Sequence, residues 1–254
     1  MKRELFVDTN VLLGLTFYSD RWYRAAQPAY ENDHELHTSE LVVFEYCCSP
    51  KPFTVPPDDP SEEDIDWSYG HGLVERLRNR ISKPYRDYRG RIRRLSDSEL
   101  TLERAIELFI DVFEIRKQAE PQIRTEFEEE FREKAITRQY INRFASKLID
   151  KILNASEEMK SELADIVEVH HSKYHVAMED KRRWEDFPEQ PPDEPDLSIM
   201  VDATEIIKEN SVNTVLTGDS DLLVLQSVAK DYFRFDILSM DDEYSVGNEP
   251  RADQ

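Results

Sequence analysis

Short apolar runs alternate with longer amphipathic segments near both ends of the chain. Four runs bounded by polar residues are typical of buried strands, and they lie at residues 5–7, 35–38, 212–216 and 235–239. Four segments with one apolar side predict helices, at residues 11–30, 40–46, 196–207 and 222–229. Because these strands and helices alternate, we expect an α/β fold built on a parallel sheet that is flanked by helices.

The middle of the chain has a different pattern. Two proline-rich breaks, at residues 49–66 and 187–195, enclose a segment whose apolar residues recur at helical spacing, as Leu73, Leu77 and Ile81 do. The pattern predicts an all-helical insertion at residues 51–189, between the parts of a discontinuous α/β core at residues 1–50 and 190–241. Residues 242–254 are expected to form a polar tail.

The net charge of −21 and the pI near 4.7 leave two interpretations open. One is an acidic surface suited to a cytoplasm rich in salt, where ions screen the repulsion between carboxylates. The other is a protein that repels nucleic acid and binds cationic partners.

Several features favour a cytoplasmic protein that does not bind membranes. We find no run of about 18 apolar residues, which a membrane span needs, and no apolar region of a signal peptide at the start of the sequence. Cys47 and Cys48 are adjacent within an apolar stretch, so we expect small core residues of a reducing compartment rather than a disulfide or metal ligands.

The segment at residues 76–94 is basic, in contrast to the acidic chain around it. A solvated helical face explains such a run. A surface that contacts RNA phosphates explains it equally well, since arginine forks fit phosphate oxygens and Tyr85 and Tyr88 are placed to stack on unpaired bases. The candidate contacts are Arg76, Arg80, Lys83, Arg86, Arg89, Arg91, Arg93 and Arg94.

Four carboxylates stand where the hydrophobic pattern would not place them. Asp8 and Asp219 each follow a predicted strand. Glu45 adjoins the apolar face of a helix, and Asp196 opens another. Neighbouring parallel strands end at the same edge of a sheet, so Asp8 and Asp219 are expected to meet there. The alternative for Asp8 is that it only caps the helix that follows it.

A cluster of carboxylates predicts a bound cation, because the acids raise one another's pKa unless a positive charge joins them. A ligand set made only of oxygens favours Mg²⁺ or Mn²⁺. Two such ions can activate a water and stabilise the leaving oxygen in phosphodiester hydrolysis.

In their order along the chain, these motifs resemble the PIN-domain nuclease family. The matching stretches are residues 7–12 (Val-Asp-Thr-Asn-Val-Leu), Glu45, residues 196–203 with their apolar positions, and residues 217–222 (Thr-Gly-Asp-Ser-Asp-Leu). The resemblance covers about residues 3–48 and 192–240 and leaves the insertion unmatched. It implies a Rossmann-like sheet and metal-dependent cleavage of single-stranded or structured RNA.

The resemblance also implies which residues form the site. Its acidic quartet carries over to Asp8, Glu45, Asp196 and Asp219, with Asp221 at the position of a frequent fifth acid. Asn10 and Thr217 match the polar residues that orient the acids, and Thr9 is taken with them. Two alternatives stay open, since Asp202 competes with Asp196 for the third position and Asp221 also suits the cap of the following helix.

Three histidines close together, His170, His171 and His175, raise the question of a zinc site. The sequence offers no nearby cysteine or third ligand, so a structural or surface role is the interpretation that we favour.

These observations predict a metal-dependent endoribonuclease that leaves 5′-phosphate and 3′-hydroxyl ends, as the resemblance implies. A non-catalytic RNA- or protein-binding module that keeps the fold is the alternative. A third hypothesis is a scaffold that oligomerises through the insertion. The chain is longer than the small toxin nucleases of toxin–antitoxin pairs, which argues against a toxin, although a homo-oligomer and an inhibitory protein partner both stay open.

Overall fold

The computed structural model describes residues 3–32, 34–48, 67, 72–189 and 191–241. Its centre is a five-stranded sheet in the order β3-β2-β1-β4-β5, in which every neighbouring pair is parallel. The expected α/β class with a parallel sheet is therefore confirmed. The strands are β1 (Glu4–Val7), β2 (Glu35–Ser39), β3 (Val167–His170), β4 (Thr214–Thr217) and β5 (Asp236–Ser239).

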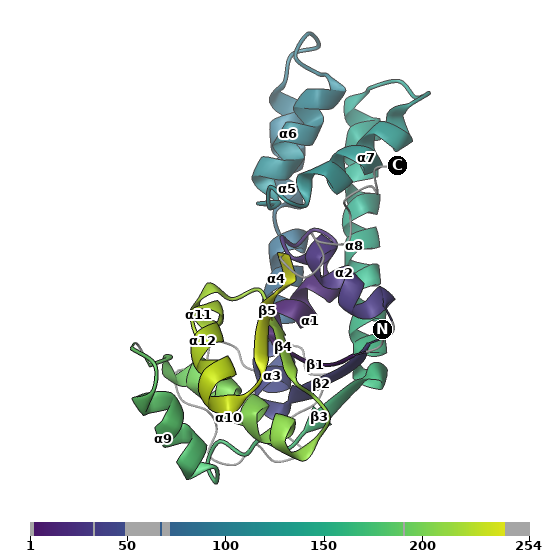
Figure 1. Cartoon of the computed structure of the whole chain (residues 1–254). Coiled ribbons are helices and arrows are strands. Elements are labelled where there is room, and N and C mark those ends of the chain that lie inside the picture. The colour runs from purple at the N-terminus through teal and green to yellow at the C-terminus, as the bar shows by residue number, and fades with distance from the viewer. Residues whose placement is uncertain (1–2, 33, 49–66, 68–71, 190, 242–254) are drawn as a thin grey trace, which may run out of the picture.

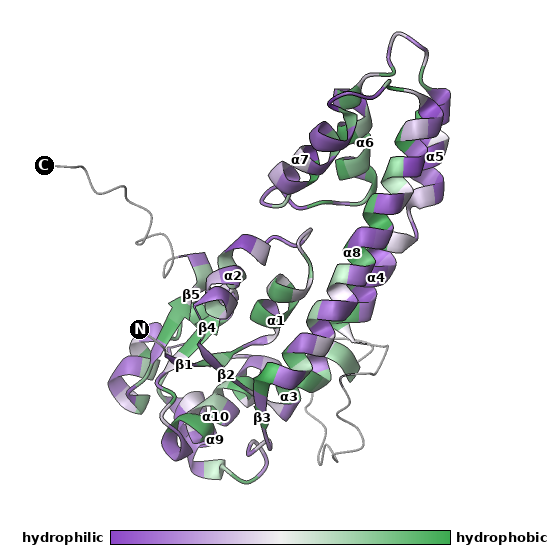
Figure 2. Ribbon diagram, turned by 90° about the vertical axis from the view of Figure 1, so that its right-hand side faces the viewer, coloured by the Kyte–Doolittle hydropathy of each residue, from purple (hydrophilic) through white to green (hydrophobic). Residues whose placement is uncertain are grey.

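Helices cover both faces of the sheet (Figures 1 and 2). One face carries α1 (Thr9–Thr16), α2 (Tyr23–Glu31) and the lower end of α8 (Arg138–Ile166), whereas α9 (Met178–Asp186) and α10 (Glu194–Glu209) lie on the other. Because α1 lies between the sheet and α8, seven of its eight residues are buried, Thr9 and Thr16 among them. The shorter elements are α3 (Glu40–Val43), the π-helix η1 (Phe44–Cys48), α11 (Ser220–Leu223), α12 (Gln226–Val228) and the π-helix η2 (Ala229–Phe233).

A helical arm, residues 73–166, extends away from the sheet (Figure 1). It consists of α4 (Leu73–Ser82), α5 (Tyr85–Arg94), α6 (Leu102–Val112), α7 (Glu120–Phe131) and the long α8. Aromatic rings fill its far end. The ring of Phe109 stacks on that of Phe113 with 4.3 Å between the ring centroids, and Phe127 contacts Phe144 edge-on with a centroid distance of 4.8 Å. The arm therefore has an apolar core that continues into the core of the rest of the chain.

The arm differs from the expected insertion at its end. We expected an all-helical insertion at residues 51–189, but α8 runs directly into β3, which pairs with β2 as the edge strand of the sheet. Only four residues long, β3 follows a 29-residue helix without a break, so no local pattern separates the two. The expected all-helical character of this segment is thus wrong at residues 167–170.

Two helices that we expected as single elements are divided. The segment at residues 11–30 forms α1 and α2, because the chain turns at Asp20, whose carboxylate accepts a hydrogen bond from the Trp22 amide at 3.0 Å. The segment at residues 222–229 forms α11, α12 and the start of η2. Cys47 and Cys48 are buried and form no disulfide with each other, as expected of core residues.

Candidate active site

Asp8 lies at the carboxyl end of β1, where the buried strand gives way to α1. Its backbone is extended, and its Oδ1 accepts a hydrogen bond from the Val11 amide at 3.0 Å, so it does cap the helix. Its Oδ2 accepts a hydrogen bond from the Thr217 hydroxyl. With 2% of its surface exposed, Asp8 is a buried carboxylate, and within the described part of the chain its hydrogen-bond partners include no cation. Capping therefore accounts for only one of its two oxygens.

Asp219 reaches the same place from the other end of the chain. Because β4 pairs with β1, with Leu216 opposite Val7, the two strands end side by side. The Asp219 amide donates to Thr217 Oγ1 at 2.8 Å, and Asp219 Oδ1 caps α11. The Asn10 side-chain amide lies 3.4 Å from Asp219 Oδ2. The expected meeting of Asp8 and Asp219 is therefore observed, with Thr217 between them.

Glu45 comes from the π-helix η1, which continues α3. The Thr9 hydroxyl donates to Glu45 Oε2 at 2.5 Å, so the residue after Asp8 holds this third carboxylate. The wider turn of a π-helix re-aims side chains and is frequent at functional sites. On its other side η1 packs closely on the arm, since a Cβ at Gly72 would lie 2.4 Å from Cys47 Cα.

Asp196 lies in the first turn of α10, which begins two residues earlier than the sequence suggested. The alternative third acid, Asp202, lies on the same helix, but its carboxylate contacts a different part of the chain. Asp202 Oδ1 accepts hydrogen bonds from the backbone of Lys173 at 2.8 Å and of Tyr174 at 3.0 Å, and from Ser172. Asp202 thus holds the loop after β3, and of the two acids only Asp196 faces the other three.

The four acids line one cavity of about 140 Å³. Apolar side chains form the rest of its wall together with the threonine and the amide next to Asp8. Asp221 is exposed and is not part of the wall, although its charge helps to raise the pKa of Asp196. The lining residues are Asp8, Thr9, Asn10, Glu45, Leu73, Pro195, Asp196, Ile199, Asp219 and Leu222.

Burial raises the pKa values of three of the acids that line this cavity. It raises the pKa of Asp8 to about 7, with smaller contributions from the charges of Asp219 and Glu45. Burial, followed by the charge of Asp219, raises the pKa of Asp196 to about 7 as well. The pKa of Glu45 is raised mainly by burial and is lowered in part by Arg76. Within the described residues the cavity is therefore rich in acids whose charge is only partly compensated.

The carboxylates of the four acids do not form a tight cluster. Within the described residues, the groups of three or more histidines, cysteines or acids whose ligand atoms all lie within 4.8 Å of one another are found elsewhere in the fold. A hard divalent cation that keeps several waters suits such a spacing better than an ion that is enclosed by protein ligands alone.

A second cavity, of about 270 Å³, adjoins the acidic one and shares Asn10 and Leu73 with it. Arginines from three separate segments line it. Two of them, Arg76 and Arg80, belong to the predicted basic segment. No pattern in the sequence pointed to the other two, Arg21 and Arg116. Its charged lining residues are Arg21, Arg76, Arg80, Arg116 and one acid, Asp20.

Arg76 lines the arginine cavity and also acts on an acid of the neighbouring cavity. It lowers the pKa of Glu45, and its Nε and Nη2 are buried without a hydrogen-bond partner within the described part of the chain. A guanidinium in this state is costly unless an acceptor reaches it.

The other candidate phosphate contacts in the basic segment, residues 76–94, do not line either cavity. Arg91 pairs with Asp87 and Asp111, and Tyr88 is fully buried with its hydroxyl on the Ala105 carbonyl, so the expectation that Tyr88 stacks on bases is wrong. Tyr85 is half-buried, and its hydroxyl donates to the Asn142 carbonyl. The remaining five lie exposed and line neither of the two cavities; they are Lys83, Arg86, Arg89, Arg93 and Arg94.

Trp22 joins the arginine cavity to the turn that carries Asp219. A Cβ on Gly218 would lie 2.6 Å from Trp22 Cε2, and a Cβ on Gly14 would lie 2.8 Å from Trp22 Cβ. The close approach of Trp22 Cβ therefore requires the glycine at position 14, and that of the indole requires Gly218, which explains the glycine in the Thr-Gly-Asp motif.

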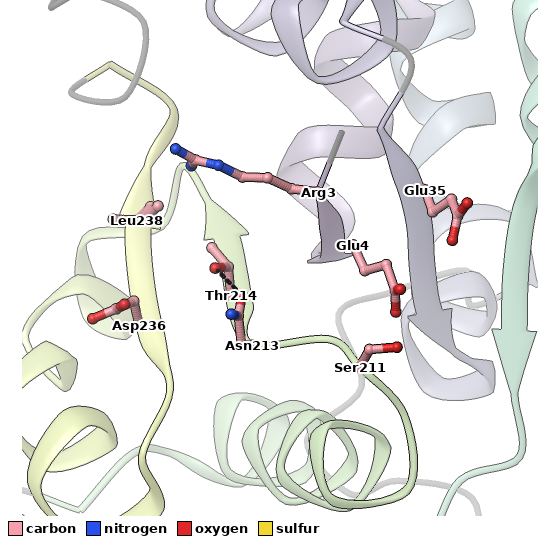
Figure 3. A pocket seen from close by; sticks show the side chains of 8 residues that line it. All are labelled: Arg3, Glu4, Glu35, Ser211, Asn213, Thr214, Asp236 and Leu238. Atoms are coloured by element: carbon pink, nitrogen blue, oxygen red, sulfur yellow. Dashed lines mark hydrogen bonds between the residues drawn. The ribbon is translucent and has the colours of Figure 1, made fainter. Parts of the chain in front are cut away.

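A larger cavity, of about 670 Å³, lies at the opposite edge of the sheet, where the parallel strands begin (Figure 3). Arg3 extends along its rim, and Glu4 and Glu35 lie on one side of it. It is not our candidate, because open α/β sheets bind ligands at the carboxyl ends of their strands, where the four acids meet.

Comparison of the chain with models of protein families, with curated proteins and with solved structures finds no match. Within the described residues, the helices are all too short or too polar to cross a membrane.

Proposed function

We propose that this chain is a metal-dependent endoribonuclease of the PIN-like kind, as the motifs of its sequence suggest. The observation that supports it most is the convergence of Asp8, Glu45, Asp196 and Asp219 on one cavity, with the pKa of two of them raised to about 7. Acids in this state would gain stability from a divalent cation, and their oxygens suit Mg²⁺ or Mn²⁺.

The proposal gives each side chain a task. Asp8 and Asp219 would hold the first ion, Glu45 and Asp196 would complete the sites and position the attacking water, and Asp221 would be a further ligand. Thr217 and Thr9 fix the carboxylates of Asp8 and Glu45 through their hydroxyls. Bound ions would lower the pKa of that water and supply positive charge for the leaving oxygen.

The neighbouring arginine cavity supports a polyanionic substrate. Arg21, Arg76, Arg80 and Arg116 outnumber the single Asp20 that lines the cavity with them. Because this cavity shares Asn10 and Leu73 with the acidic one, a strand whose scissile phosphate lies among the acids would place an adjoining phosphate among the arginines. A chain of −21 charge can thus attract RNA locally.

The remaining parts of the proposal concern fold and compartment. We propose a PIN-like core at residues 1–50 and 190–241 with a helical insertion at residues 51–189, of which residues 51–66 and 68–71 lie outside the described part of the chain. The predicted polar tail at residues 242–254 lies outside it as well. The cytoplasm is the proposed compartment, and the reduced thiols of Cys47 and Cys48 suit it.

A cleavage assay on a labelled single-stranded RNA with Mn²⁺ tests the activity. We expect Asp219→Asn to lose more than about 100-fold in rate, because a neutral amide binds the ion more weakly than a carboxylate and does not balance its charge. The exposed Asp150→Asn is the matched control and should cleave like the wild type. Undiminished cleavage by Asp219→Asn would rule the site out, and tight RNA binding without any turnover in the wild type would favour the binding module instead.

A further inference from the structure

Two histidines and a glutamate lie together on the strands β2 and β3, away from the acidic cavity. The parallel register sets His37 opposite Glu168 and Ser39 opposite His170. Because alternate residues of a strand share a face, the side chains of all three lie on the same face of the sheet. None of them lines the cavity of the four acids.

Their ligand atoms are spaced as those of a tetrahedral metal site. His37 Nδ1 lies 3.0 Å from His170 Nε2 and 3.7 Å from a Glu168 oxygen, and His170 Nε2 lies 3.6 Å from the other oxygen. Ligands at about 2.0–2.1 Å from a tetrahedral ion are roughly 3.3 Å apart, so the three separations fit around a single ion.

The group is buried at one end and open at the other. The side chain of His37 is 6% exposed, and its Nε2 has no hydrogen-bond partner within the described residues. The Glu168 side chain is 63% exposed, so one side of the group is open to water.

A carboxylate stands behind His37, on the side of its second nitrogen. Glu4 Oε2 lies 3.9 Å from His37 Nε2, and Glu35 pairs with Glu4 across β1 and β2, so the two carboxylates lie next to each other (Figure 3). Metal-binding histidines usually have such a carboxylate near the ring nitrogen that does not bind the metal. At 3.9 Å the Glu4 carboxylate is near His37 Nε2 but beyond hydrogen-bond distance of it.

We propose that His37, His170 and Glu168 bind one zinc ion or a similar borderline metal, with water in the fourth position. Two imidazoles and a carboxylate suit Zn²⁺ and not Mg²⁺, which distinguishes this site from the acidic one. The ion would join the edge strand β3 to β2. Since α8 leads directly into β3, the same ion would fix the base of the helical arm to the sheet.

The question of zinc that the sequence raised concerned a different group, His170, His171 and His175, for which we favoured a structural or surface role. His171 instead contacts Glu40, with Nδ1 at 2.6 Å from a carboxylate oxygen, and the exposed His175 follows in a turn. Of the three, only His170 belongs to the proposed site. Its partner His37 is 133 residues away in the chain, which is why spacing could not reveal the pair.

Zinc titration of the full chain in excess Mg²⁺ tests the proposal, because Mg²⁺ then occupies sites made only of oxygens. We expect one zinc per chain by calorimetry, and a visible absorption typical of tetrahedral coordination when Co²⁺ replaces zinc. His170→Gln should weaken zinc binding at least about tenfold and abolish the Co²⁺ spectrum, since it removes one of three protein ligands.

Two further variants separate a loss of zinc binding from a loss of folding. Glu168→Gln changes an exposed side chain, so it should fold normally and still lose zinc affinity. The exposed His175→Gln is the control and should bind zinc like the wild type. If the wild type binds no zinc, as a plain hydrogen-bonded histidine pair predicts, or if His170→Gln and Glu168→Gln both bind with unchanged affinity, the proposal is wrong.

Discussion

Thr217 donates its hydroxyl hydrogen to the carboxylate of Asp8, 209 residues away in the chain. Its oxygen in turn accepts the amide hydrogen of Asp219 at 2.8 Å. One buried side chain therefore sets the relative position of the two acids that we assign to the first metal ion. A residue with this role acts on the metal through its neighbours.

Thr217→Val should weaken Mn²⁺ binding and slow RNA cleavage by about 10- to 100-fold, because it removes the hydroxyl and keeps the shape. The matched control is Thr214→Val on the same strand, whose hydroxyl contacts only the Asn213 side chain among the hydrogen bonds described. Calorimetric titration with Mn²⁺ and the cleavage rate measure the two effects. Equal losses in both variants would mean that strand stability, and not the position of Asp8, accounts for the result.

Asp196 and Asp202 should separate function from folding. Asp196→Asn is expected to weaken Mn²⁺ binding with little effect on the free energy of unfolding, since this residue is half-buried and faces the cavity. Asp202→Asn is expected to lower the free energy of unfolding by about 1–3 kcal/mol, because three donors depend on its Oδ1. Urea unfolding and Mn²⁺ titration of both variants check this, and the opposite pattern would make Asp202 the ligand.

The stabilisation by metal should depend on pH. Burial, with smaller contributions from neighbouring acids, raises the pKa of Asp8 and of Asp196 from 3.8 to about 7, so the metal-free folded state binds more protons than the unfolded state between these values. The stability that these groups contribute is therefore fully present below about pH 4 and is lost as the pH rises through about 7. A divalent cation replaces those protons, so its effect should be largest at high pH.

We therefore expect Mn²⁺ to raise the melting temperature by several degrees at about pH 8 and by much less at about pH 5.5. Differential scanning fluorimetry with and without Mn²⁺ measures this difference, and Asp219→Asn should show no gain at either pH. A gain that is the same at both pH values would contradict the assignment of Asp8 and Asp196 as ligands.

The arginine cavity should determine how strongly RNA binding depends on salt. Replacing Arg76 and Arg116 by Gln is expected to lower the slope of log affinity against log salt by about 0.7 for each lost phosphate contact. Replacing the exposed Arg93 and Arg94 by Gln removes the same charge at a distance from both cavities and should leave the slope unchanged. Fluorescence anisotropy in the presence of Ca²⁺, at several salt concentrations, provides the slopes. An equal decrease in both double variants would assign RNA binding to the arm as a whole.

Local patterns along the chain predicted the elements that position the acids. Asp8 and Asp219 follow apolar runs that form buried strands, and the pairing of β1 with β4 places both at one edge of the sheet. Glu45 was predicted on a helix, and it lies on the π-helix that follows α3. The choice between Asp196 and Asp202 needed coordinates, because both are buried or half-buried on one helix and only the surroundings of each differ.

Long-range contacts could not be read from the sequence in the same way. Arg21 and Arg116 share a cavity with Arg76 although they lie in different segments. The strand β3 was missed because it is short and follows α8 directly, and with it the neighbourhood of His37 and His170. In each case the signal lies in tertiary packing and not in the periodicity of one element.

A crystal of the full chain soaked with Mn²⁺ tests the central claim most directly, since the anomalous scattering of manganese locates the ion independently of any activity. We predict at least one peak within coordination distance of both Asp8 and Asp219, in the cavity that they share with Glu45 and Asp196. Manganese that binds only at other places, with these four carboxylates free of metal, would contradict the account.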